Sequence, residues 1–210
     1  MRRRGVALLL AVAWSGLDFA QPRALPVLVP VARGSDAVTV TCLTDVLTRA
    51  GANVTLASAE KTLRLNLGGL TVVADTSLAN CEGVDWAAIA CPGGEQGAER
   101  LADSRPLLEL LRRQRKQLRV LAAVGESPAE LLAEHQLLEF DEKATCLPNP
   151  RLKKVIGAAC AGWWDAAVVV DRKVVTSQGP GTALACALKI VELLYGAPKA
   201  KELSSQLLST

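Results

Sequence analysis

The residues in this chain with the strongest capacity for chemistry are six cysteines and a single histidine, His135. No two cysteines form a CxxC pair, and one histidine cannot complete the common zinc ligand sets, so the sequence predicts no metal site and indicates no cofactor. Cys42, Cys91 and Cys186 lie in apolar stretches. There cysteine behaves as a small buried hydrophobe, although the even count leaves disulfides open.

A second chemical candidate is the segment Gly125-Glu126-Ser127-Pro128, which directly follows the apolar run 118–124. The spacing of Gly125 and Ser127 is similar to the start of a hydrolase Gly-x-Ser-x-Gly elbow, but Pro128 breaks that pattern. We interpret Ser127 as a helix N-cap and Glu126 as a helix-start carboxylate favoured by the helix dipole. A shift in register that makes Glu126 a general base is the alternative.

The elements that position these residues are predicted from runs of apolar residues and their punctuation. Strands are expected at 24–31, 53–57, 63–67, 71–74, 86–91, 118–124, 143–146, 166–170 and 173–176, and helices at 36–51, 104–116, 128–133 and 182–195. Two of the strand pairs, 63–67 with 71–74 and 166–170 with 173–176, are expected to form hairpins. Strands that alternate with helices and are apolar throughout are typical of a parallel sheet covered on both faces. We therefore predict an α/β, flavodoxin-like three-layer sandwich with a mostly parallel sheet.

Ligands of such sheets gather at the carboxyl ends of the strands. Three loops fall there, at 33–36, 92–94 and 125–127. Their convergence predicts a pocket at this edge of the sheet, where Gly93, Gly94, Gly125 and Glu126 meet.

The first residues differ from the rest of the chain. Three arginines at positions 2–4 precede an apolar run over 5–17, which is the pattern of a leader. We predict a cleavable leader at 1–21 and a single domain at 22–210, with delivery to an organelle (plastid or mitochondrion) or to the secretory route. An irregular arm or a wrong start codon is the alternative, and would leave the protein in the cytoplasm.

Without residues 1–21, which carry three arginines and one aspartate, the formal charge falls from +3 to +1. This charge is too small to predict a nucleic-acid partner. The remaining chain also has no run of about 20 apolar residues, so no membrane span is predicted.

Four motifs resemble the ThiJ/PfpI superfamily, of the parkinsonism-associated deglycase type with a class I glutamine amidotransferase-like fold. They are the opening strand, loop and helix at 31–51, Cys91-Pro-Gly-Gly94, the strand-to-helix elbow at 121–129, and Ser177-Gln-Gly-Pro-Gly-Thr182. The resemblance runs in order from about residue 25 to the C-terminus. It implies the same fold and a homodimer.

The resemblance also implies site positions, and this chain departs from them. Gly125 stands where the family has its nucleophilic cysteine, and Thr39 stands where the family has the glutamate partner. Leu147 stands where some relatives have histidine. Because glycine has no side chain to attack with, we expect a degenerate site and a non-catalytic binding, stress-response or regulatory homologue. A small polar or carbonyl ligand is expected, in a pocket that the resemblance extends to Thr39, so that its lining is Gly93, Gly94, Gly125, Glu126 and Thr39.

The alternative is a glyoxalase/deglycase-like or amidase-like enzyme that uses a relocated thiol, for which Cys146 and Cys91 are the candidates. A thiol needs a basic partner to lower its pKa, and the sequence offers neither cysteine an obvious one. A holdase-like chaperone role, independent of any thiol, is a third possibility that the resemblance implies.

Overall fold

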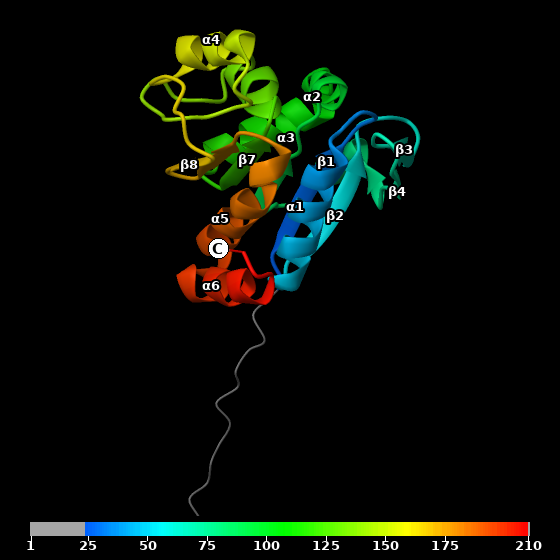
Figure 1. Cartoon of the computed structure of the whole chain (residues 1–210). Helices are drawn as coiled ribbons and strands as arrows, with labels where there is room; N and C mark the ends of the chain where they lie inside the picture. The colour runs from blue at the N-terminus through cyan, green and yellow to red at the C-terminus, as the bar shows by residue number, and fades with distance from the viewer. Residues whose placement is uncertain (1–23, 210) are drawn as a thin grey trace, which may run out of the picture.

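The computed structural model describes residues 24–209, so the predicted leader at 1–21 lies outside the described residues (Figure 1). A seven-stranded sheet forms the centre, in the order β5-β2-β1-β6-β7-β9-β8. All neighbours are parallel except β8 and β9, which form an antiparallel pair. The strands are β1 Pro26–Val31, β2 Asn53–Ser58, β5 Thr76–Ser77, β6 Ala88–Cys91, β7 Val120–Val124, β8 Val168–Asp171 and β9 Val174–Ser177.

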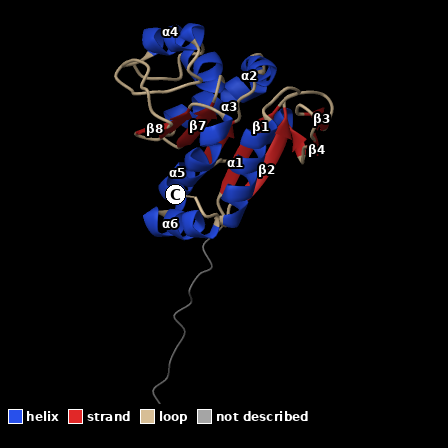
Figure 2. Ribbon diagram, viewed as in Figure 1, coloured by secondary structure: helices blue, strands red, loops and turns tan. Residues whose placement is uncertain are grey.

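Helices cover both faces of this sheet, as Figures 1 and 2 show. They are α1 Ala37–Arg49, α2 Glu95–Ala102, α3 Arg105–Lys116, α4 Pro150–Ala159, α5 Ala183–Tyr195 and α6 Ala197–Gln206. Successive residues of a strand point to opposite faces, and β1 shows the consequence. Val27 and Val29 pack in a core with α1, α5 and α6, whereas Leu28 packs in a second core with α2, α3 and α4. The predicted three-layer fold is confirmed.

Two hairpins predicted from the sequence are also confirmed. The antiparallel pair β3 Arg64–Asn66 and β4 Thr71–Val73 forms a separate small sheet, and the pair β8–β9 ends the main sheet. The first hairpin packs against the start of α1 through a small core that contains Val31, Val40 and Leu65. It therefore lies beside the carboxyl end of β1 (Figure 1).

The strand predicted at 143–146 is wrong. Of these residues, only Ala144 forms a β-bridge, to Trp163, and the backbone N–H groups that follow bind other partners. The N–H of Thr145 donates to the hydroxyl of Thr176, and the N–H of Leu147 donates to the carbonyl of Gly125. This segment therefore connects the last strands to the loop after β7.

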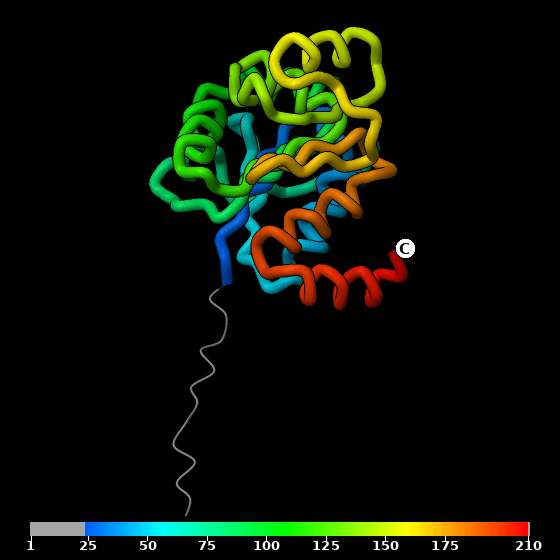
Figure 3. Tube along the Cα trace, turned by 90° about the vertical axis from the view of Figure 1, so that its left-hand side faces the viewer, coloured from blue at the N-terminus to red at the C-terminus, as the bar shows by residue number. Residues whose placement is uncertain are grey.

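The helix predicted at 128–133 has those bounds, but Pro128–Ala133 is a π-helix. The sequence analysis missed α2, α4 and α6. Figure 3 shows α4, in yellow, at one end of the molecule and α6, in red, at the other. Among residues 24–209, no helix combines the length and the apolar character that crossing a bilayer requires.

Candidate functional site

The three loops predicted to form a pocket do meet at the carboxyl ends of β1, β6 and β7. The N–H of Asp36 donates to the carbonyl of Gly93 over 2.7 Å, which joins the first loop to the second. The second and third loops are joined by Ser127, whose hydroxyl donates to the carbonyl of Pro92 over 2.5 Å. The loops thus form one hydrogen-bonded unit.

Gly125 forms the bend after β7 and is fixed on both sides by backbone hydrogen bonds. Its N–H donates to the carbonyl of Ser177 over 2.9 Å, and its carbonyl accepts from the N–H of Leu147 over 2.8 Å. Its φ is +69°, in the left-handed region that glycine adopts without strain. A Cβ at this position would lie 3.3 Å from the Cα of Gly93. The bend is therefore narrow as well as sharp, and it presents no side chain.

Glu126, the next residue, directs its carboxylate back across the bend. Its Oε2 accepts a hydrogen bond of 2.8 Å from the N–H of Gly94, at the amino end of α2. The structure thus brings Gly93, Gly94, Gly125 and Glu126 together. Glu126 is half-buried, and its carboxylate is bound to a backbone donor, so the arrangement differs from that of a general base facing a substrate.

Thr39 is fully buried, and its hydroxyl is bound to Asp36, the N-cap residue of α1. Asp36 Oδ1 accepts from both the N–H and the hydroxyl of Thr39, each over 2.7 Å. Thr39 therefore reaches the elbow only indirectly, through Asp36 and the bond from Asp36 to Gly93. Sequence reasoning missed this role of Asp36, although an aspartate three residues before a threonine at a helix start is a capping signal.

Ser127 occupies the N-cap position of the π-helix, but its side chain makes no capping bond. Because its hydroxyl is buried and donates to Pro92, it is not available as a nucleophile. Leu147 is half-buried, and its side chain lies 3.5 Å from a Cβ built on Gly179. The side chain at this position, where the resemblance implies a histidine in some relatives, therefore makes an apolar contact beside the turn at 177–182.

The two candidate thiols are buried and protonated. Cys91 and Cys146 are each 0% exposed. Burial raises the pKa of Cys91 to about 12. Burial also raises the pKa of Cys146 to about 12; the negative charge of Glu126 adds to the rise, and Lys153 opposes it. Since the thiolate is the nucleophile, neither residue is activated, and all six cysteines are free thiols in this structure.

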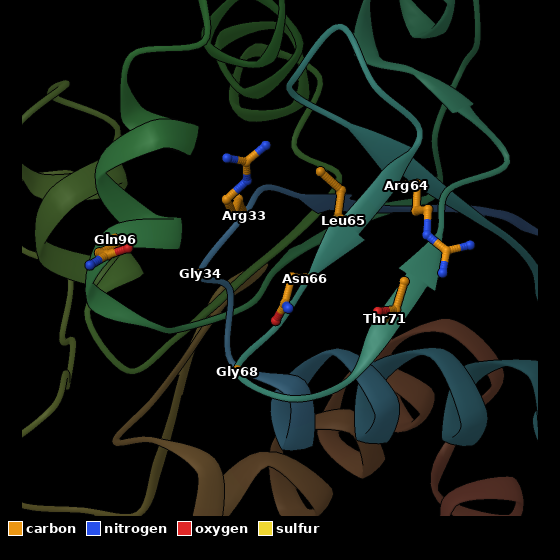
Figure 4. A pocket seen from close by; sticks show the side chains of 8 residues that line it. All are labelled: Arg33, Gly34, Arg64, Leu65, Asn66, Gly68, Thr71 and Gln96. Carbon is orange, nitrogen blue, oxygen red and sulfur yellow. The ribbon is translucent and has the colours of Figure 1, made fainter.

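A cavity of about 660 Å³ lies between the first loop, the start of α2 and the β3–β4 hairpin (Figure 4). Arg33, Arg64 and Gln96 contribute polar side chains to its wall. Figure 4 shows Arg33 and Arg64 on either side of Leu65, with guanidinium groups that point in different directions. The lining shares none of the five residues predicted for the pocket. At the predicted pocket, the carboxylate of Glu126 and the closely spaced backbones of Gly93 and Gly125 leave less room for a ligand.

Within residues 24–209, no group of three or more histidine, cysteine, aspartate or glutamate side chains is placed to hold a metal ion.

Comparison with known proteins identifies the family to which this chain belongs. Residues 26–193 match the model of the DJ-1/PfpI family. Protein DJ-1 homolog B of Arabidopsis thaliana is 38% identical over 182 residues, which are 86% of this chain and 41% of the relative. The chain thus spans less than half the length of that relative. The glutathione-independent glyoxalase DJR-1.2 of Caenorhabditis elegans is 34% identical over 88% of this chain and 95% of its own length.

A solved structure described as Toxoplasma gondii DJ-1, oxidized, has a TM-score of 0.83 and 39% identity. The likeness covers 88% of this chain and 98% of that structure. The resemblance to the ThiJ/PfpI superfamily is confirmed, and this chain belongs to the DJ-1/PfpI family.

Proposed function

We propose that this protein is a non-catalytic member of its family that binds a small polar ligand and acts in a regulatory or stress-response role. The observation that carries the proposal is the bend at Gly125, which is held by backbone hydrogen bonds and has no side chain. Nucleophilic catalysis needs a group that attacks and a base that activates it. Gly125 supplies no attacking group, and the hydroxyl of Thr39 donates its hydrogen bond to Asp36.

The alternative enzyme would have to use Cys91 or Cys146. With a pKa of about 12, the thiolate fraction of either residue is on the order of 10⁻⁵ at pH 7. Both sulfurs are also buried, so a substrate cannot reach them without a local opening of the fold. Neither observation favours a relocated nucleophile, and we do not propose one.

The test is incubation with methylglyoxal, because one relative is a glyoxalase. Loss of the aldehyde and formation of adducts would be followed by mass spectrometry, with Cys91→Ser and Cys146→Ser as matched variants. We expect no enzymatic turnover and no difference between the variants and the wild type. Turnover that either substitution abolishes would replace this proposal with the relocated-thiol enzyme.

We also propose a homodimer that forms through α1 and the β3–β4 hairpin. Val38 on α1 is 52% exposed and Val73 on β4 is 65% exposed, and Leu70 lies between the two hairpin strands at 45%. Exposed apolar groups on adjoining elements mark an interaction surface. We expect Val73→Lys to shift the mass measured by light scattering from dimer toward monomer. Val170→Lys, on the distant strand β8, is the matched control and should leave the dimer intact.

A further inference from the structure

Glu126 forms a contact that determines which ligands can use the elbow. We propose that its carboxylate is a built-in ligand for the N–H of Gly94. It takes the place that the oxygen of a carboxylate or carbonyl compound would occupy, and so makes Glu126 a specificity-determining residue. This inference rests on the proposed function only in taking the protein to bind a small polar ligand. The contact itself would exist in an active or an inactive protein.

The donor is well suited to an anion. Gly94 is the N-cap of α2, and the first N–H groups of a helix have no partner within the helix. They also carry the positive end of the helix dipole, so a negatively charged oxygen is the preferred acceptor. The Oε2 atom of Glu126 lies 2.8 Å from this nitrogen, the distance of a charge-assisted hydrogen bond.

The surrounding backbone is shaped around the carboxylate. A Cβ built on Gly93 would lie 3.1 Å from Glu126 Oε2 and 3.0 Å from the carbonyl oxygen of Val124. Glycine at position 93 therefore leaves the room that the carboxylate occupies. Hydrogen bonds from Asp36 to Gly93 and from Ser127 to Pro92 hold the turn that presents the donor. The contact between Glu126 and Gly94 thus belongs to a fixed arrangement.

An external ligand must compete with this internal carboxylate. Because the loop of Glu126 is joined to the loop of Gly94 by the bond from Ser127 to Pro92, the effective concentration of its carboxylate at Gly94 is high, in the millimolar range or above. Its negative charge also repels a second anion. Replacing it should therefore strengthen the binding of a small carboxylate at Gly94 by roughly tenfold or more, the equivalent of one charge-assisted hydrogen bond.

The experiment is a titration of the ¹⁵N-labelled full chain with sodium acetate, with the chemical shift of the Gly94 amide as the readout. In the wild type, we expect the amide to stay unchanged up to high millimolar acetate. In Glu126→Ala, we expect a saturable shift with an affinity at least about tenfold higher. Glu95→Gln is the matched control. It removes a neighbouring carboxylate in the first turn of α2 and leaves the bond between Glu126 and Gly94 intact.

Two outcomes would overturn the inference. One is saturable binding of acetate at Gly94 in the wild type with the affinity of Glu126→Ala, and the other is a gain in Glu95→Gln equal to that in Glu126→Ala, which would indicate a general charge effect. If Glu126→Ala does not fold, the wild type alone still decides. A scalar coupling across the hydrogen bond between the Gly94 nitrogen and the Glu126 carboxylate carbon is expected, and its absence would contradict the proposal. None of these readouts depends on turnover of methylglyoxal, so the inference and the proposed function can fail separately.

Discussion

The elbow after β7 and the two candidate thiols, Cys91 and Cys146, each lack what the other has. The elbow has a sharp bend at Gly125, a backbone donor at Gly94 and three loops joined by hydrogen bonds, but it has no nucleophile. Cys91 and Cys146 have a nucleophilic atom, but each is buried and its thiol is protonated. The comparison teaches that the backbone geometry of such a site is maintained by the packing of the fold. The hydrogen bonds that fix Gly125 run between backbone groups and so require no reactive side chain at that position.

The largest expected effect is a loss of stability on substitution of Gly94, which lies among the three loops of the elbow. A Cβ there would lie 2.4 Å from the carbonyl oxygen of Gly34 and 2.6 Å from the nitrogen of Asp36, and its φ is +103°. We therefore expect Gly94→Ala to lower the free energy of unfolding by more than about 3 kcal/mol. Urea denaturation measures the change.

Gly157→Ala, in the helix α4, is the matched control for Gly94→Ala. Nothing lies within 4 Å of a Cβ at Gly157, so alanine should stabilise the helix by about 0.5–1 kcal/mol. Equal effects at the two glycines would show that the three loops do not hold the turn at Gly94 as described.

A smaller loss of stability is expected when a cysteine is introduced at the elbow. Gly125→Cys places a Cβ at a φ of +69° and 3.3 Å from the Cα of Gly93, so we expect a loss of stability of about 1–2 kcal/mol. The pKa of the new thiol, measured from the pH dependence of its alkylation, then reports how Glu126 affects a thiolate at the bend. It should be lower by about one unit when Glu126→Gln is added, because that change removes a nearby negative charge.

The double variant separates two explanations of the lack of catalysis that we propose for the elbow. If the pKa of the thiol at position 125 is the same with and without Glu126→Gln, the carboxylate does not control the electrostatics of the bend. The proposed lack of catalysis would then rest only on the absence of a thiol at position 125.

Much of the fold could be predicted because its signals are local. The apolar strands β1, β6 and β7 and the two hairpins follow from runs of valine, leucine and alanine punctuated by glycine. The helix α2 was missed because its sequence, EQGAERLA, is short and contains Gly97, a residue that weakens a helix. That glycine is needed because a Cβ would lie 2.4 Å from the backbone of Ser35, a contact between distant parts of the chain that no local pattern reveals.

The candidate site divides in the same way. The convergence of three loops could be predicted from the order of the strands, since parallel strands place their carboxyl ends together. The direction of the Glu126 side chain could not, because it depends on a donor 32 positions away at Gly94. Likewise, the engagement of Thr39 by Asp36 depends on the start of α1, whose bounds a sequence pattern gives only roughly.

The central claim, that no thiol of the folded protein serves as a nucleophile, is tested most directly by site-resolved alkylation of the native chain with iodoacetamide across pH. Mass spectrometry would assign the rate at each cysteine. We predict that Cys91 and Cys146 react negligibly at pH 7 and that neither shows a titration below pH 9, because burial raises each pKa to about 12. Rapid modification of either sulfur at pH 7, with a midpoint below the reference value of about 8.5, would contradict the account.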